Sequence, residues 1–292
     1  MLEKVDLTKK ISKEEYKAKM PQMEIELGRL QRECRELKIP VMIVFEGFGA
    51  SGKGVQIGKL IQSMDPRGFQ VFPVKAETEE ERMHPFLWRF WTKTPEAGRI
   101  AIFDGSWYRK VLIDRFEKRT REKEIETAFH SIEAFEKQLT DGGTILVKLL
   151  LDIDQKEQKK RFEKLLEKKE TAWRVSQGDR ERNAKYSEYA AMMEEVLYRS
   201  DTKSAPWTVI EATDRRFATV KIYMTVIHAL AEAVEAVQRR RMEEQAIKAA
   251  EQVSGQQEAA EIMRQAGGEL EMLQSSVPVS YTHLTLPTKL EV

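Results

Sequence analysis

A glycine-rich segment with one lysine carries the clearest chemistry in the sequence. It reads Gly-Phe-Gly-Ala-Ser-Gly-Lys-Gly over residues 47–54, follows the apolar run 41–45 and precedes the apolar-periodic segment 55–64. A strand, a glycine-rich turn and a helix in this order are the context in which a phosphate-binding loop works, because backbone N–H groups and the helix amino terminus then face the anion. Lys53 would neutralise phosphate charge. The alternative is a tight structural turn. The residues expected to bind phosphate are Gly47, Gly49, Ala50, Ser51, Gly52, Lys53 and Gly54.

Phosphate chemistry usually needs a metal ion beside such a loop. The residue after the lysine is commonly Ser or Thr, whose hydroxyl holds Mg²⁺, but Gly54 has no hydroxyl. Asp104 ends the apolar run 99–104, which is the position of a magnesium-binding aspartate in such enzymes. We therefore predict that Asp104 binds Mg²⁺. The alternative is that Asp104 caps a helix that begins near Ser106.

Apolar runs of strand length alternate with helical periodicity along the chain. Strands are predicted at 41–45, 69–74, 99–104, 144–152 and 207–211. Helices are predicted at 13–37, 54–64, 79–92, 106–118, 123–140, 154–168, 180–199 and 215–240. This alternation predicts an α/β fold with a parallel sheet covered by helices on both faces. Because ligands bind at the carboxyl ends of such strands, the loop and Asp104 are expected at one edge.

The composition excludes several classes of protein. The chain has 292 residues, with 49 basic and 48 acidic side chains, so its charge favours neither a nucleic-acid nor a membrane partner. Cys34 is the one cysteine, which rules out an internal disulfide and a cysteine metal cluster. Residues 1–10 lack the apolar centre of a signal peptide, and no apolar run approaches the ~20 residues of a membrane span. These features predict a cytoplasmic protein.

Further motifs surround the loop and give the sequence a resemblance to a known family. In order, they are residues 45–54, 78–90, 102–108, 171–179 and 205–210. They resemble the patterns F-E-G-x-D-A-A-G-K-G, T-x-E-E-x-x-x-P-x-L-W-R-F, I-F-D-R-S-W-Y, K-x-W-K-x-S-x-x-D and A-P-W-x-V-I of the family-2 polyphosphate kinases, especially the polyphosphate:AMP phosphotransferases. The resemblance covers about residues 1 to 235.

The resemblance implies both a fold and an activity. The fold would be that of P-loop kinases of the thymidylate-kinase type, with a helical lid at about 154–200. The activity would be magnesium-dependent transfer of a phosphoryl group between inorganic polyphosphate and a nucleotide, converting AMP to ADP. By the same resemblance, Lys53 and the loop amides hold the transferring phosphate, and Asp104 holds Mg²⁺ or orients the acceptor.

Basic residues of the lid are a separate implication of the resemblance. Arg161, Arg174 and Arg182 would gather the polyanion, since phosphoryl transfer rests on positioning and charge neutralisation. Arg161 and Arg174 would act in catalysis and Arg182 in phosphate binding; for each, the alternative is a surface helix cation. The lysines of the same region are either a solvated helix face or a track for the polyphosphate chain. They are Lys156, Lys159, Lys160, Lys164, Lys168 and Lys169.

The sequence departs from the family patterns at two positions. Gly49 replaces the loop aspartate, and Gly105 replaces the arginine after Asp104. Losing such groups costs on the order of 100-fold or more in rate when they contact the transition state. The alternative to an enzyme is thus a degenerate polyphosphate-binding or structural domain of a two-domain fused enzyme. A more distant alternative is an ATP-dependent nucleoside or nucleotide kinase, against which Gly54 and the tryptophan-rich motifs count.

Composition also divides the chain. We predict a helical segment at 1–38, a P-loop phosphotransferase domain at 39–238 and a polar helical linker or tail at 239–278. Residues 279–292 resemble the translation of a sequencing adapter, and we interpret them as a non-native tail. A homo-oligomer or a fused second copy of the domain is expected.

Overall fold

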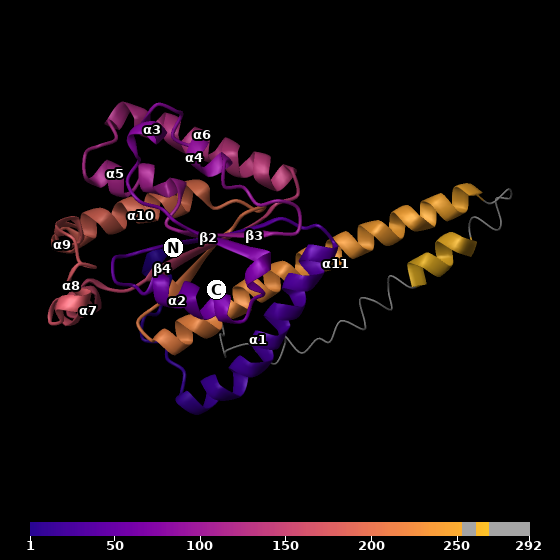
Figure 1. The fold of residues 1–292 in the computed structure, drawn as a ribbon, viewed down its shortest axis with the longest axis horizontal. Helices are drawn as coiled ribbons and strands as arrows, with labels where there is room; N and C mark the ends of the chain where they lie inside the picture. Colours follow the sequence, from indigo (N-terminus) through magenta and orange to yellow (C-terminus); the bar gives the residue numbers. More distant parts are fainter. Residues whose placement is uncertain (253–260, 269–292) are drawn as a thin grey trace. The chain divides into compact units, whose positions relative to one another are not determined.

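The computed structural model describes residues 1–252 and 261–268. The chain divides into two compact units, Met1–Val234 and a second that begins at Glu235. The first unit holds the sheet and the predicted lid (Figure 1). In the second, helix α11 continues to Gln252 and residues 261–268 are helical. The predicted non-native tail at 279–292 and part of the predicted linker lie outside the described residues.

A parallel sheet forms the centre of the first unit. Its strands are β1 (Val41–Gly47), β2 (Phe69–Pro73), β3 (Ile100–Asp104), β4 (Ile145–Asp152) and β5 (Trp207–Glu211). They pair in the order β2-β3-β1-β4-β5, and every pairing is parallel. The central strand β1 is buried along its whole length, as its apolar sequence predicts. The predicted α/β fold is therefore confirmed.

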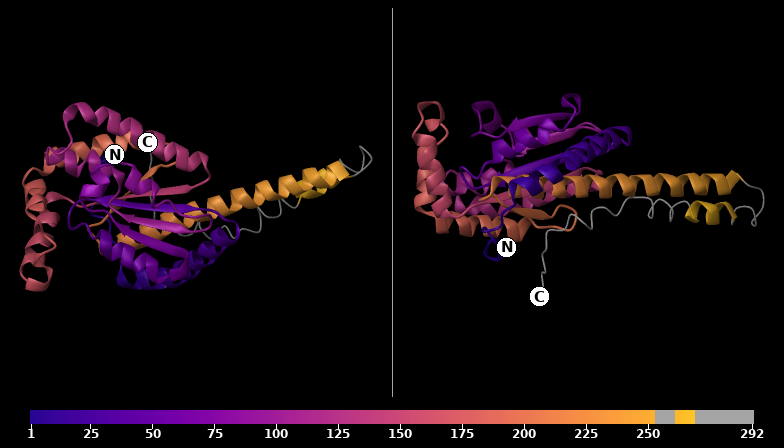
Figure 2. Two further views of the ribbon diagram at one scale, coloured as in Figure 1. Left: turned by 45° about the horizontal axis from the view of Figure 1, so that its top comes forward. Right: turned by 90° about the horizontal axis from the view of Figure 1, so that it is seen from below.

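Helices cover both faces of the sheet and one of its ends. Helices α1, α2 and α11 lie on one face and α6 and α10 on the other, while α7, α8 and α9 stand together at one end (Figures 1 and 2). The longer helices are α1 (Lys13–Glu36), α2 (Lys53–Gln62), α6 (Glu122–Asp141), α7 (Gln155–Leu166), α9 (Gln177–Ala184), α10 (Tyr186–Ser200) and α11 (Arg215–Gln252). One-turn helices are α3 (Glu79–Arg82), α4 (Trp88–Trp91), α5 (Ile113–Phe116) and α8 (Lys169–Ala172), and 3₁₀ turns occupy Leu2–Lys4, Pro66–Gly68 and Trp107–Lys110.

Three predicted helices are interrupted by local signals, and a fourth, predicted at 215–240, extends to Gln252. The helix predicted at 79–92 breaks into α3 and α4, since Pro85 disfavours helical backbone at the residue before it. The helix predicted at 106–118 is a 3₁₀ turn followed by α5, separated by Leu112 with φ −110° and ψ −86°. The helix predicted at 180–199 begins earlier, at Gln177, because Ser176 and Asp179 form a capping box, and it is interrupted at Lys185.

Helix α11 corrects the expectation that no apolar segment of the chain is long enough to span a membrane. By length and mean hydropathy, Arg215–Lys248 could cross a membrane, but 61% of its most apolar window is buried inside the structure. Phe217, Val220, Tyr223 and Val226 are almost fully buried. The apolar side of α11 is therefore explained by the core of the first unit.

Candidate functional site

The glycine-rich loop joins β1 to α2, as predicted. Gly47 has φ 141°, and a Cβ atom there would lie 2.3 Å from the carbonyl oxygen of Leu151, so only glycine fits. Gly52 has φ 106° and is the N-cap of α2. Ala50 adopts a left-handed backbone with φ 58°, which is costly for a residue with a Cβ. The loop therefore holds a strained conformation that turns the chain into the helix.

Lys53 begins helix α2 and lies in the cleft beside the loop. Its Nζ atom donates to the carbonyl oxygen of Gly47 at 3.2 Å. The ammonium group thus folds back over the turn whose N–H groups would face an anion.

Asp104 ends β3 directly beside the loop. It pairs in register with Phe45 of β1, two residues before Gly47, and it lines the same cleft as Lys53. The alternative role, as a helix cap, is not what the structure has. Ser106 is the N-cap of the following 3₁₀ turn, and its Oγ accepts from the N–H of Tyr108 at 3.3 Å.

The cleft beside the loop has a volume of about 850 Å³ and a strongly positive lining. It opens between the loop, the end of β3, helices α7 and α8 of the predicted lid, and the start of α11. Asp104 is the acidic residue of the lining. The basic residues are Lys53, Arg161, Lys164, Lys168, Arg174 and Arg215. Such an excess of positive charge in a concave surface favours a polyanionic ligand.

Arg161 lies in this cleft, but its guanidinium group is turned to the backbone. Its side chain is 9% exposed and pairs through Nε with Glu157 at 2.7 Å. Nη1 donates to the carbonyl oxygens of Ala50 and Ser51 at 3.1 and 3.0 Å. Nη2 donates to those of Ala212 and Thr213 at 2.8 and 2.9 Å. The surface-cation alternative does not fit this residue.

The other two lid arginines lie in different surroundings. Arg174 is exposed on the cleft, with its guanidinium carbon 5.4 Å from the ring centre of Trp173. Arg182 is 11% exposed and outside the cleft lining, where it bridges Glu117 at 2.6 Å and Asp179 at 2.7 Å. The structure therefore places Arg174 in the same cleft as the loop, and it ties Arg182 into contacts that join α9 to the end of α5.

The run of lid lysines divides between the two roles that the sequence left open. Lys164 and Lys168 line the cleft. Lys164 lies on α7, one turn after Arg161, and Lys168 is the N-cap of α8. Lys156, Lys159 and Lys160 are exposed and lie outside the cleft lining.

Two residues of the site were missed from the sequence. Glu46, inside the motif of the loop, is buried and accepts from the hydroxyl of Ser106 at 2.7 Å. Burial raises the pKa of Glu46, opposed by the Lys53 ammonium and the Ser106 bond. Arg215, at the start of α11, reaches the cleft from a segment far along the chain. The E-G pair of the motif was a signal for Glu46, whereas no local pattern marks Arg215.

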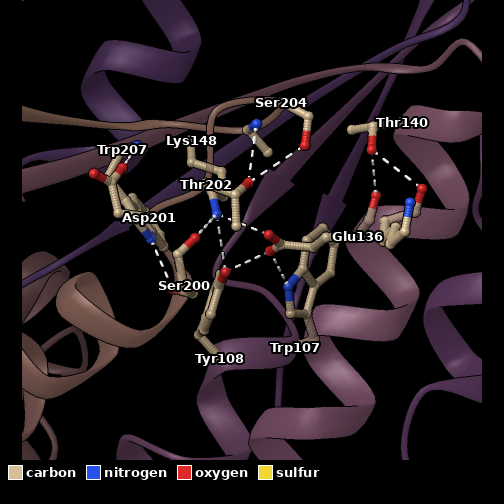
Figure 3. A network of polar contacts seen from close by, with 12 residues as sticks. Trp107, Tyr108, Glu136, Thr140, Lys148, Ser200, Asp201, Thr202, Ser204 and Trp207 are labelled. Carbon is tan, nitrogen blue, oxygen red and sulfur yellow. Dashed lines mark hydrogen bonds and ion pairs between the residues drawn. The ribbon is translucent and has the colours of Figure 1, made fainter.

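A buried polar network fixes the turn that follows Asp104. Lys148 of β4 is fully buried, and its Nζ donates to Glu136 at 2.7 Å, to the carbonyl of Ser200 at 2.6 Å and to the hydroxyl of Tyr108 at 3.2 Å. Glu136 also accepts from Trp107 Nε1 at 2.9 Å and from Tyr108 (Figure 3). All three ammonium protons thus have acceptors, and the 3₁₀ turn is tied to β4, α6 and α10.

Comparisons with known proteins agree with this fold and loop. The family model "Polyphosphate kinase 2 (PPK2)" matches residues 10–240. A polyphosphate:AMP phosphotransferase of Pseudomonas syringae pv. tomato is 36% identical over 233 residues, which are 80% of this chain and 47% of the relative. An NDP-polyphosphate phosphotransferase 3 of Ruegeria pomeroyi is 31% identical over 74% of this chain and 72% of its own. This chain therefore spans about half the length of the polyphosphate:AMP phosphotransferases that it matches.

A solved structure extends the agreement to three dimensions. The crystal structure of polyphosphate kinase 2 from Arthrobacter aurescens TC1 superposes with a TM-score of 0.75 at 30% identity, covering 80% of this chain and 85% of that one. With the P-loop kinase-like sheet, the glycine-rich loop and a family match over most of its length, the chain belongs to the polyphosphate kinase 2 family.

Proposed function

We propose that this domain transfers a phosphoryl group between inorganic polyphosphate and a nucleotide, converting AMP to ADP. The observation that carries the proposal is the cleft at the phosphate loop, whose lining has five basic side chains, besides the ion-paired Arg161, and the single carboxylate of Asp104. A polyphosphate chain carries charge along its whole length, and a cleft of this sign favours its entry. Relatives named for polyphosphate, AMP and nucleoside diphosphates support the choice of substrates.

In this proposal the phosphate loop holds the transferring group. The N–H groups of the loop and the amino terminus of α2 stabilise the phosphate oxygens, and Lys53 leaves the Gly47 carbonyl to neutralise their charge. Lys164, Lys168 and Arg174 line the path of the rest of the chain. The domain thereby positions the phosphate and offsets the charge that builds up during transfer.

We further propose that Asp104 holds Mg²⁺ together with phosphate oxygens and water. Among the described residues, no group of three or more His, Cys, Asp or Glu side chains is placed to bind a metal. Mg²⁺ suits such a sparse site, because it keeps several waters and is commonly bound by one or two carboxylates plus substrate phosphates. When bound, the ion would neutralise charge on the transferring phosphoryl group. Glu46 interacts electrostatically with Asp104, but it is buried and outside the cleft lining, so Asp104 is the carboxylate that faces the ligand.

The proposal extends to the setting of the enzyme. Since AMP and ADP are metabolites of the cell interior, we propose a cytoplasmic location, with polyphosphate and AMP as partners and neither nucleic acid nor membrane. Because this chain spans about half of several relatives, a second copy of the domain, fused or as a homo-oligomer, is also proposed. Light scattering of the purified chain measures its mass in solution and tests the homo-oligomer.

An assay of the purified full chain tests the function. AMP, polyphosphate and Mg²⁺ are incubated with the protein and with a Lys53→Ala variant, and ADP is quantified by chromatography. ADP formation that requires Lys53 is the expected result. Polyphosphate binding without ADP formation would contradict the proposed transfer and support a domain that only binds the polymer.

A further inference from the structure

We infer that one face of α7 clamps the phosphate loop by donating hydrogen bonds to the backbone carbonyls of the loop. Gln158 and Arg161 are then positioning residues, and Gly49 is the point where this face packs against the loop. Gln158, Arg161 and Phe162 stand at spacing i, i+3 and i+4, so they share one side of the helix. All three are buried.

Three consecutive carbonyls of the loop contact this face. Gln158 Nε2 donates to the oxygen of Gly49 at 3.0 Å. Arg161 Nη1 donates to the oxygens of Ala50 and Ser51. When the carbonyls of a loop are held outward in this way, its N–H groups can face an anion on the other side. The N–H of Ser51 is the exception, because it donates to the carbonyl oxygen of Phe48 at 3.1 Å. The clamp also secures Ala50, the loop residue with the strained left-handed backbone.

The guanidinium group of Arg161 has no proton left for a phosphate. Its five N–H bonds match five acceptors, which are Glu157 and the carbonyls of Ala50, Ser51, Ala212 and Thr213. Through the last two carbonyls, the same group ties the loop to the segment that leads into α11. Arg161 therefore acts on the ligand through the loop, unlike Lys164 on the next turn.

Gly49 gives this face of α7 the room to approach. A Cβ atom at this position would lie 3.0 Å from Asp179 Oδ1, 3.1 Å from Phe162 Cζ and 3.4 Å from Gln158 Nε2. Gly49 is not among the glycines with left-handed backbone, so the requirement is one of space. An aspartate at position 49 would also face the carboxylate of Asp179. Although burial opposes ionisation there, bonds from Ser176 and Arg182 hold the pKa of Asp179 below its usual value.

Hydrogen exchange of the loop amides in the free protein tests the clamp. We expect Arg161→Lys and Gln158→Glu to speed exchange at residues 49–53 on the order of tenfold, with the sheet unchanged, because each loses donors to the loop. Gln158→Glu keeps an acceptor for Asn183, which now donates to Gln158 at 2.8 Å. Lys164→Ala is the matched control on the same helix, and its loop exchange should stay at the wild-type rate. Equal exchange in Arg161→Lys and wild type would overturn the clamp.

A pair of glycine substitutions tests the docking point. Gly49→Ala and Gly49→Asp should speed exchange of the loop and of α7, with the larger effect for aspartate. Gly54→Ala is the control, because a Cβ there has nothing within 4 Å, and its exchange should be no faster than wild type. If Gly49→Ala and Gly54→Ala exchange alike, Gly49 is not a docking point.

The roles of Arg161 and Lys164 in polyphosphate transfer rest on the proposed function, and the kinetics of ADP formation test them separately. Arg161→Lys should lower kcat for ADP formation about tenfold with little change in KM for polyphosphate, whereas Lys164→Ala should mainly raise KM. A larger effect of Arg161→Lys on KM than on kcat would contradict a positioning role. Absence of transfer in the wild type would count against the proposed function alone, since the exchange measurements need no substrate.

Discussion

Replacing any one of the exposed cations of the cleft should weaken polyphosphate binding by a modest factor and should not abolish it. Lys164, Lys168 and Arg174 are exposed, so each interaction with a phosphate is worth about 0.2–1 kcal/mol, or roughly 1.5- to 5-fold in affinity. Each alanine variant should weaken polyphosphate binding by that factor, and more at low salt. Fluorescence anisotropy with labelled polyphosphate measures the change. Lys160→Ala on the same helix but outside the cleft lining is the control; an equal loss there would show that only net charge matters.

Replacing Asp104 should lower the rate of phosphoryl transfer and should not weaken polyphosphate binding. Asp104→Asn keeps the shape of the residue and removes its negative charge, so the rate of ADP formation should fall on the order of 100-fold or more. Binding of polyphosphate without Mg²⁺ should stay the same or become tighter, since a negative charge has left the cleft. A magnesium titration of the initial rate checks the assignment. A variant with wild-type rate and wild-type magnesium dependence would remove Asp104 from the metal site.

Single residues also show which parts of the site could be predicted from the sequence. Lys53 and Asp104 could be placed together because each adjoins the carboxyl end of a parallel strand, which is a local and regular signal. The contacts of Arg161 could not be predicted. Four of its five acceptors are backbone carbonyls more than fifty residues away, and every residue type has such a carbonyl, so the sequence does not mark them. Arg215 was missed for a similar reason, since only the tertiary fold brings α11 to the cleft.

Among the elements, the turn after β3 depends on a buried ion pair. Lys148→Met would leave the carboxylate of Glu136 buried without its cation, which costs about 3–5 kcal/mol of unfolding free energy. Adding Glu136→Gln should recover part of that loss, because glutamine can still accept from Trp107 and Tyr108. Chemical denaturation of both single variants and the double variant gives the coupling energy. Additive losses would show that the pair is not coupled.

Strand β4 ends at a carboxyl group that makes stability depend on pH. Burial, together with Asp154 and Glu211, raises the pKa of Asp152 to about 6 from 3.8, against a bond from the Ile153 N–H. The folded protein then holds a proton that the unfolded chain releases, so stability should fall as pH rises from about 4 to about 6 and level off above it. The loss amounts to about 3 kcal/mol.

Asp152→Asn isolates this effect. Asparagine keeps an oxygen for the Ile153 N–H and has no proton to lose, so the variant should be the more stable protein at pH 8, and this difference should shrink towards pH 4. Other groups titrate in both proteins and cancel in the comparison. Urea denaturation across that range measures the difference, and a gap that does not change with pH would refute the assignment.

The elements were easier to predict than their interruptions. Apolar runs such as 41–45 and 144–152 specify buried parallel strands almost regardless of context. The breaks near Pro85 and Leu112 were missed, because the apolar residues of both segments keep a helical spacing in the sequence. The capping box of Ser176 was a readable signal for the start of α9.

The molecule as a whole combines a family fold with a loop that lacks one family carboxylate. Gly49 and Gly105 were the reasons to expect a degenerate domain. In the structure, Gly49 provides room for α7, and Gly105 has φ 77°, a backbone that suits glycine. Both glycines thus have structural explanations, while the positive cleft, Lys53 and Asp104 remain together at the edge of the sheet.

Transfer of phosphate to AMP is the most direct measure of this account. Purified full-length chain with AMP, polyphosphate and Mg²⁺ should form ADP at a rate that falls on the order of 100-fold or more in Lys53→Ala. Circular dichroism of the variant checks that its fold is unchanged. ADP formation that survives Lys53→Ala, or its complete absence from a folded wild-type protein that binds polyphosphate, would contradict the proposal that this cleft catalyses phosphoryl transfer.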